Sequence, residues 1–224
     1  LINFNLDGSA FAAGLPRFID TLIGCALAWF GVSFIWPDWK FRRLPRSIQR
    51  SLQAQCKYLA EVVEQYHQGR NNALNYRVVR RAAHNTDAEV ASLISTLATE
   101  PNIESTQKTL AFEFLCLSHT FLSYIAALGA HREQIQDQEV LTLLDQALDD
   151  IQGALLRDEV PDLSAQNMMQ TIREHLNRKE ENNQKSLIIL QQLSLMLSIL
   201  TRLSMLKQSL SHEPNEDGTE FASL

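Results

Sequence analysis

The sequence contains few of the residues that interrupt helices. Its 224 residues include eight glycines and six prolines, and no stretch of useful length alternates apolar with polar side chains. Glycine and proline mark turns, and a period of two marks half-buried strands. Their scarcity argues against a sheet-based fold, so we expect an all-α protein.

Cysteine is also scarce. The three cysteines, Cys25, Cys56 and Cys116, are isolated from one another and form no CxxC pair. Such spacing gives no disulfide framework and suits a reducing compartment. The six histidines are scattered without the spacing of metal ligands, so we expect no metal and no cofactor.

The motifs of common enzyme classes are absent from the sequence. It has no HExxH, GxSxG, P-loop or Rossmann glycine pattern, each of which supplies the ligand, nucleophile or phosphate cradle that its chemistry requires. We therefore expect no enzyme and no catalytic residue. The formal net charge is −6, and residues 51–224 alone carry −9. Since nucleic-acid binding needs a broad basic surface, we expect no nucleic-acid partner.

What the sequence does contain is a long apolar run, FIDTLIGCALAWFGVSFIW, with one charge, Asp20, near its start. A helix of ~20 mostly apolar residues can cross the ~30 Å hydrocarbon layer of a bilayer. We interpret residues 17–37 as a transmembrane helix. The alternative is a buried core helix or hairpin of a soluble protein, but such apolar runs are usually shorter and lack a basic segment on one side.

The residues after this run set its expected orientation. A basic juxtamembrane collar follows at residues 38–50. We expect Trp36, just before it, and six residues within it to lie at the lipid interface: Trp39, Lys40, Arg42, Arg43, Arg46 and Arg50. Aromatic residues favour the bilayer interface, and positive charge gathers on the cytoplasmic side beside anionic lipid. We therefore expect residues 1–16 to be an extracytoplasmic loop, and the rest of the chain to be cytoplasmic. A signal peptide would carry its basic residues before the run.

Beyond the collar the sequence predicts a cytoplasmic helical bundle over residues 51–212. Apolar side chains recur every three or four positions in six segments, which begin near Pro45, Ala73, Ser105, Asp137, Ser164 and Ser186. This period is typical of amphipathic helices that share a core. Residues 213–224 are acidic and poor in apolar side chains, so we expect a disordered tail.

The last of these six helices, SLIILQQLSLMLSILTRLSMLKQSL, is apolar on nearly every face. It could be a second membrane span, but Gln191, Gln192 and Arg202 would then lie in hydrocarbon, where an Arg costs ~2.5 kcal/mol or more. A central helix surrounded by the other five would be apolar all round for reasons of packing alone. We favour this central position.

Small residues form a stripe on the predicted span. The stripe and the charges beside it comprise Arg17, Asp20, Thr21, Gly24, Ala28 and Gly31. Small residues on one face let a second helix approach closely in lipid, so the stripe predicts packing against other transmembrane helices of the same protein. Alternatively, Arg17 and Asp20 simply pair with each other in the outer headgroups.

The run LPRFIDTLIGCALAW, followed by FIWPDWKFRRLP and a long helical region, resembles the last span and C-terminal region of the YccS/YhfK-type inner-membrane proteins. These proteins belong to the fusaric-acid-resistance (FUSC) superfamily of efflux transporters, which is related to aromatic-acid exporters. The most specific part is the R-x-x-x-T-x-x-G pattern at Arg17, Thr21 and Gly24. The resemblance implies a multi-spanning permease. Because the chain has no initiator Met, we expect it to be a C-terminal fragment.

A basic cluster lies on one face of the second bundle helix, at Arg77, Arg80, Arg81 and His84. Such a face could hold an anion or a lipid phosphate. The alternative is an intramolecular salt-bridge face, paired with the acidic helix of Asp145, Asp149 and Asp150.

From these features we expect a homo-oligomeric efflux permease of a bacterial inner membrane, with the bundle regulating or assembling it. The rival interpretation is a membrane-tethered helical module that binds proteins and transports nothing. The small-residue stripe favours the permease because a simple tether can have any apolar face.

Overall fold

The computed structural model describes residues 8–31, 40–70, 73–99, 103–131, 133–159, 162–178 and 184–211, and these contain helices and no strand. The predicted all-α class is confirmed. The chain divides into two compact units, residues 1–39 and 40–224. Two predicted features, the interface residues Trp36 and Trp39 and the acidic tail 213–224, lie outside the described residues.

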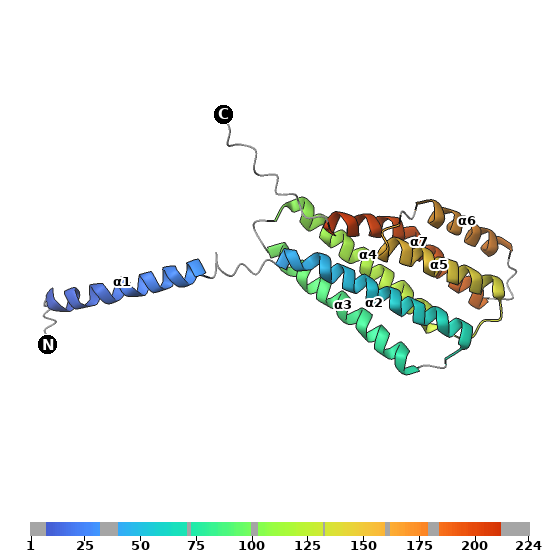
Figure 1. Cartoon of the computed structure of the whole chain (residues 1–224), viewed down its shortest axis with the longest axis horizontal. Helices are drawn as coiled ribbons and strands as arrows, with labels where there is room; N and C mark the ends of the chain where they lie inside the picture. Colours follow the sequence, from blue (N-terminus) through green and yellow to red (C-terminus); the bar gives the residue numbers. More distant parts are fainter. Residues whose placement is uncertain are drawn as a thin grey trace, which may run out of the picture. The chain divides into compact units, whose positions relative to one another are not determined.

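Among the described residues of the first unit there is one helix, α1, which spans Gly8–Phe30 (Figure 1). It begins before the predicted start at Arg17, so residues 8–16, which we expected in a loop, are helical. Alanine is the best helix former, and Ala10, Ala12 and Ala13 fill this stretch. Residues 32–37, the predicted end of the span, lie outside the described residues.

The described residues of the second unit form six helices, which run alongside one another in Figure 1. They are α2 (Lys40–Gln68), α3 (Ala73–Thr99), α4 (Ser105–Ala130), α5 (Gln138–Leu156), α6 (Asp162–Arg178) and α7 (Gln184–Ser211). All six predicted helices are therefore present. α3 begins at Ala73, as predicted.

Helix α7 packs against α2, α4, α5 and α6. We expected it to be surrounded by all five other helices, and this is wrong for α3, which packs on α2 and α4 at the far edge of the bundle from α6 (Figure 1). α2 also contacts four helices, α3, α4, α5 and α7. Two helices, rather than one, therefore occupy central positions.

The core of the bundle is formed by large side chains that solvent does not reach. α2 supplies Leu52 and Tyr66, α4 supplies Phe114 and Phe121, and α7 supplies Leu200, all at 0% exposure. Each such side chain contributes ~1.5–3 kcal/mol when it is removed from water. This burial explains why α4 and α7 are so apolar.

Two helix ends follow local capping chemistry. Gly69 ends α2 with φ +78°, a left-handed conformation that suits glycine. Asp137 caps α5, accepting a hydrogen bond from the Val140 backbone N–H at 3.4 Å. α5 ends at Leu156. α6 starts at Asp162 rather than after a cap at Ser164.

The largest correction concerns the start of the bundle. α2 begins at Lys40 and contains Pro45, which we expected to mark its first turn. Leu44 and Ile48 are fully buried in the core, and Ser47 is buried beside them. The predicted collar at 38–50 is therefore not a separate segment, because residues 40–50 are the first turns of α2.

Candidate functional site

The predicted motif face is continuous along α1. Arg17, Thr21, Gly24 and Ala28 follow one another at helical spacing, and the Thr21 hydroxyl donates to the Arg17 carbonyl at 2.8 Å. A Cβ atom added at Gly24 or at Gly31 would meet nothing within 4 Å. Within the first unit the stripe is therefore uncovered, and another helix could lie against it.

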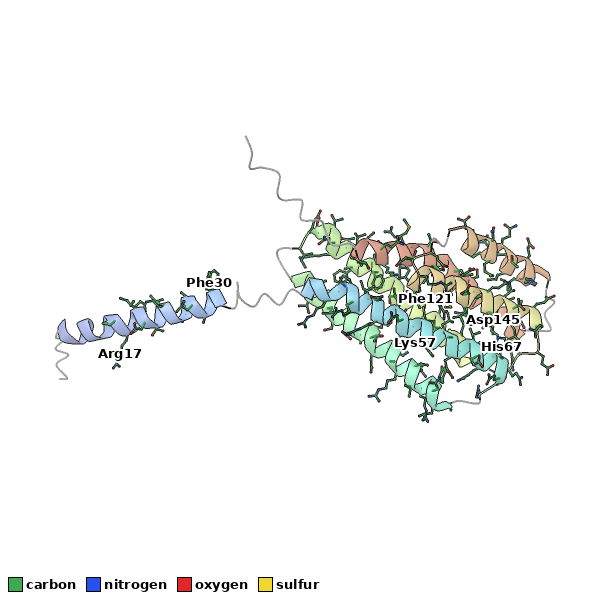
Figure 2. All side chains as sticks on the ribbon, in the orientation of Figure 1. Arg17, Phe30, Lys57, His67, Phe121 and Asp145 are labelled. Atoms are coloured by element: carbon green, nitrogen blue, oxygen red, sulfur yellow. The ribbon has the colours of Figure 1, made fainter. Side chains whose placement is uncertain are left out.

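The remaining faces of α1 carry large apolar side chains that are exposed. Phe18 is 64% exposed, Leu27 67% and Trp29 68%, and Ile19, Leu22, Ile23 and Phe30 are exposed too. In Figure 2, Arg17 and Phe30 lie near opposite ends of the part of α1 whose side chains are described. An apolar surface of this extent is rare on soluble proteins and marks contact with protein or membrane.

The basic residues that follow the predicted span lie on one side of α2. Arg43, Arg46 and Arg50 are exposed, and Lys57 continues their row two turns further along the helix. Lys40 and Arg42 belong to the same helix by its bounds. Lys57 was not part of the predicted collar. Its signal in the sequence is the seven-residue spacing from Arg50, which returns to the same face of a helix.

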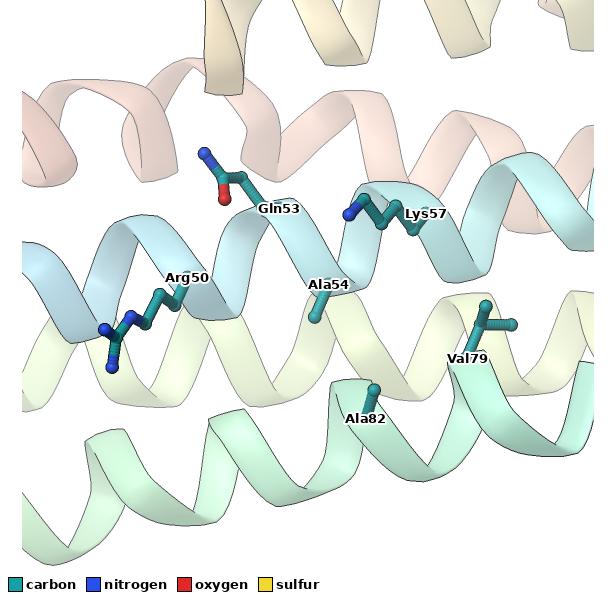
Figure 3. A pocket seen from close by; sticks show the side chains of 6 residues that line it. All are labelled: Arg50, Gln53, Ala54, Lys57, Val79 and Ala82. Carbon is teal, nitrogen blue, oxygen red and sulfur yellow. The ribbon is translucent and has the colours of Figure 1, made fainter.

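A groove between α2 and α3 lies beside this basic row. It encloses about 160 Å³ and is lined by Arg50, Gln53, Ala54 and Lys57 of α2, and by Val79 and Ala82 of α3 (Figure 3). The three small or apolar side chains form its floor, and the two cations lie on its α2 rim.

The predicted basic cluster of α3 is solvent-exposed. Arg77, Arg80, Arg81 and His84 are all exposed, and Arg77 donates to the Ala73 carbonyl of its own helix at 3.2 Å. The pairing with the acidic helix is not formed among the described residues, because α3 does not pack against α5.

The acidic residues of α5 pair with other basic residues. Asp145 Oδ1 lies 2.9 Å from His67 Nε2 of α2 (Figure 2), and Asp149 Oδ1 lies 3.0 Å from Arg157. The Arg157 guanidinium donates to Glu159 and Asp149, and these bonds raise the pKa of Arg157.

A buried polar network joins α2, α3 and α4, and sequence reasoning missed it. The Asp87 carboxylate accepts from Gln55 at 3.4 Å and from Ser118 at 3.3 Å, and its other oxygen lies 2.9 Å from His119 Nδ1. Gln55 and Ser118 are both fully buried. The available signal was a polar residue at a core-facing position of an apolar helix, which usually has a partner.

A surface ion pair links α4 to α7. Arg202 donates twice to the Glu113 carboxylate, at 2.6 Å each, and these hydrogen bonds lower the pKa of Glu113. The pair explains why Arg202 is compatible with an otherwise apolar helix. Lys185 of α7 similarly donates to Glu133, whose pKa is also lowered.

By length and apolar composition alone, two helices of the described residues are able to cross a membrane. They are α4 and α7, and not the single helix that we predicted. The core helix of a soluble protein meets the same criteria, and both helices contribute many buried residues to the bundle. Among the described residues no group of three or more His, Cys, Asp or Glu side chains could hold a metal ion.

The chain has curated relatives among bacterial proteins. It is 44% identical over 217 residues to the inner membrane protein YccS of Escherichia coli (strain K12). The aligned region covers 96% of the chain and 30% of that protein. It is 37% identical over 61% of its length to an uncharacterized protein of Haemophilus influenzae, and 37% identical over 45% to an uncharacterized protein, ORF2, of Neisseria gonorrhoeae. The chain thus spans less than a third of the length of these relatives.

No protein-family model matches the chain, and no solved structure matches it. The match to the E. coli protein nevertheless includes almost every residue of the chain, and it agrees with the resemblance carried by Arg17, Thr21 and Gly24. The chain belongs to the YccS-type inner membrane proteins, and it corresponds to one part of their length.

Proposed function

We propose that the chain is the C-terminal part of a multi-spanning efflux permease of the FUSC type. Residues 17–37 form its last span, and α2–α7 form a cytoplasmic bundle that regulates or assembles the transporter. The protein resides in a bacterial inner membrane as a homo-oligomer and carries no catalytic residue.

One observation carries this proposal: α1 leaves its large apolar side chains uncovered, whereas α4 and α7 bury many of theirs in the bundle. Lipid and neighbouring spans would cover α1 without cost to the bundle. The membrane assignment of the similar E. coli protein supports the same placement.

The stripe on α1 supports a position within a group of spans. Close approach of helices in lipid relies on small residues, because no hydrophobic force draws helices together there. Gly24 and Gly31 have open space where a side chain would be. We propose that another span of the same protein occupies this space.

The bundle has its own core and forms its own compact unit. This observation also fits the rival function, a membrane-tethered module that binds protein partners without transport. The two proposals differ in what they require of α1, since a tether needs only to insert.

A first experiment tests topology in the full-length protein that contains this chain. Reporters are fused after Ser211: a fluorescent protein that is active in the cytoplasm, and alkaline phosphatase, which is active outside it. The basic residues after the span predict fluorescence and no phosphatase activity. Phosphatase activity would contradict the cytoplasmic bundle and would indicate that α7 crosses the membrane.

A second experiment separates permease from tether. Cells that lack the full-length protein are complemented with variants, and retention of labelled fusaric acid, an aromatic carboxylate, is measured together with membrane abundance. Ala28→Leu adds bulk to the stripe, and Ala26→Leu adds the same bulk to the opposite face of α1. The permease predicts lost efflux for Ala28→Leu and near-normal efflux for Ala26→Leu.

Arg17 gives a further comparison in the same assay. Arg17→Ala should reduce efflux, and Arg17→Lys should restore it only in part, since lysine cannot reproduce a planar guanidinium contact. Normal efflux by Ala28→Leu and Arg17→Ala at normal abundance would favour the tether.

A further inference from the structure

We propose that the groove between α2 and α3 binds the headgroup of an anionic phospholipid, with Arg50 and Lys57 contacting the phosphate. The groove is the one lined by Arg50, Gln53, Ala54, Lys57, Val79 and Ala82. The inference rests on the proposed cytoplasmic position of α2 for its physiological meaning, whereas the binding itself can be tested separately.

The charge of the rim is available to a ligand. Neither Arg50 nor Lys57 forms an ion pair or hydrogen bond with any residue that the structure describes. Other bundle cations are engaged: Arg157, Lys185, Arg202 and Lys207 each contact a carboxylate. Arg50 and Lys57 thus place two unpaired positive charges beside one groove, an arrangement that favours anions there.

Two cations on one face of α2 flank the groove, and in Figure 3 the Arg50 guanidinium points away from Lys57, so an anion held by both would draw the Arg50 side chain back along the helix. Arg50 and Lys57 are seven residues apart, or about 10 Å along the helix axis, on the same face of α2. In Figure 3 the Lys57 side chain extends along α2 in the direction of Arg50, above Ala54. An arginine fork and a flexible ammonium group are the usual partners of phosphate oxygens.

The floor of the groove distinguishes a lipid from free phosphate. Ala54, Val79 and Ala82 contribute apolar side chains to the groove of about 160 Å³, which Arg50, Gln53 and Lys57 line as well. A free phosphate ion gains nothing from such a surface, whereas the glycerol and first methylenes of a phospholipid can cover it. Arg43 and Arg46 extend the same basic face towards the start of α2, the end that follows the predicted span.

The test uses the full 224-residue chain in a neutral maltoside detergent and titrates dihexanoyl phosphatidylglycerol by calorimetry. The variant Arg50→Gln/Lys57→Gln removes the rim charges. Arg80→Gln/Arg81→Gln removes the same charge from another exposed face and serves as the control. We expect about a tenfold loss of affinity in the groove variant and less than about a twofold loss in the control.

A second pair tests the floor without changing charge. Ala82→Leu fills the groove, and Ala88→Leu places the same side chain on an exposed face of α3 outside it. Weaker lipid binding by Ala82→Leu alone would support a seated headgroup. Equal effects of the two charge variants, or of the two leucine variants, would overturn the site.

Two further arms identify the ligand. Inorganic phosphate that competes as well as the lipid would make this a free-phosphate site and overturn the lipid assignment, as would equally tight binding of zwitterionic dihexanoyl phosphatidylcholine. Weak competition and weak binding, respectively, support it. These results do not depend on the topology or efflux assays, so the groove and the proposed function can fail separately.

Discussion

At Gly129, in the last turn of α4, the bundle has no room for a side chain. An added Cβ atom would lie 2.6 Å from the Tyr76 hydroxyl, 3.1 Å from that of Tyr58 and 3.3 Å from Val62. The two tyrosines are buried, and their hydroxyls lie 3.0 Å apart. Gly129→Ala should therefore lower the free energy of unfolding by ~1–3 kcal/mol, although alanine favours helix. Thermal and denaturant unfolding would measure this change.

Two variants control this prediction. Tyr76→Phe removes the hydroxyl nearest the new methyl group, so Gly129→Ala should cost less in that background. Gly153→Ala in α5 also places a Cβ against a side chain, but the neighbours are the exposed ends of Glu159 and Arg157, which can move. That substitution should be neutral or stabilising, and an equal loss at both glycines would contradict the account.

Cys56 makes stability depend on pH in a defined direction. Burial raises the pKa of its thiol from 9.0 to about 12, with the Lys207 charge opposing in part. Above pH 9 the unfolded chain releases a proton that the native bundle retains, so the free energy of unfolding falls as pH rises towards 12. The slope reaches ~1.4 kcal/mol per pH unit for one group.

The measurement compares wild type with Cys56→Ala in denaturant titrations from pH 8 to pH 11. The cost of the lost side chain is the same at each pH, so only the thiol changes the difference between the two curves. We expect wild type to lose stability relative to Cys56→Ala above pH 9. Parallel curves would show that the thiol ionises equally in both states.

At the scale of elements, the helices themselves could be predicted because their signals are local. Apolar spacing, Gly69 and Asp137 are all properties of neighbouring residues. The partners of each face could not be predicted. Which helix meets Arg77 and Arg81 depends on the order of packing, and α3 contacts α2 and α4 rather than the acidic α5.

The same limit applies to the choice between span and core helix. α4 and α7 are apolar enough to span a membrane, and composition cannot reveal that the bundle covers them. Packing does reveal it, since Leu200 of α7 is fully buried while Leu195 is 38% exposed. In lipid, both positions would require an apolar residue, whereas in a water-soluble bundle only the buried position 200 requires one.

This difference gives a prediction for α7. Leu200→Lys should unfold the bundle, since losing a buried leucine costs ~2–5 kcal/mol and the lysine adds an unpaired buried charge. Leu195→Lys should be tolerated, because its ammonium group reaches solvent. Limited proteolysis of the full chain in detergent would show rapid cleavage for the first variant alone. Cleavage of both would favour a membrane position for α7.

At the scale of the whole molecule, the candidate sites were only partly predictable. The α1 stripe lies within one helix, so its spacing alone defines its members, and its role in packing stays a prediction. The groove joins Arg50 and Lys57 to Val79 and Ala82 of another helix, and the network of Asp87 joins three. Such sites exist only after packing, so a sequence can suggest their members but not their association.

The two compact units predict where the chain can be divided. Residues 40–211, expressed without α1, should be soluble, helical by circular dichroism and cooperative in unfolding, because the described core lies within them.

Residues 51–211, which start where we first placed the bundle, lack Leu44 and Ile48, both fully buried. Each contributes ~1.5–3 kcal/mol by burial, so the shorter piece should be less stable by ~3–6 kcal/mol. Equal stability of the two pieces would contradict the extended α2, and a requirement for detergent by residues 40–211 would contradict the assignment of α4 and α7 to a water-soluble core.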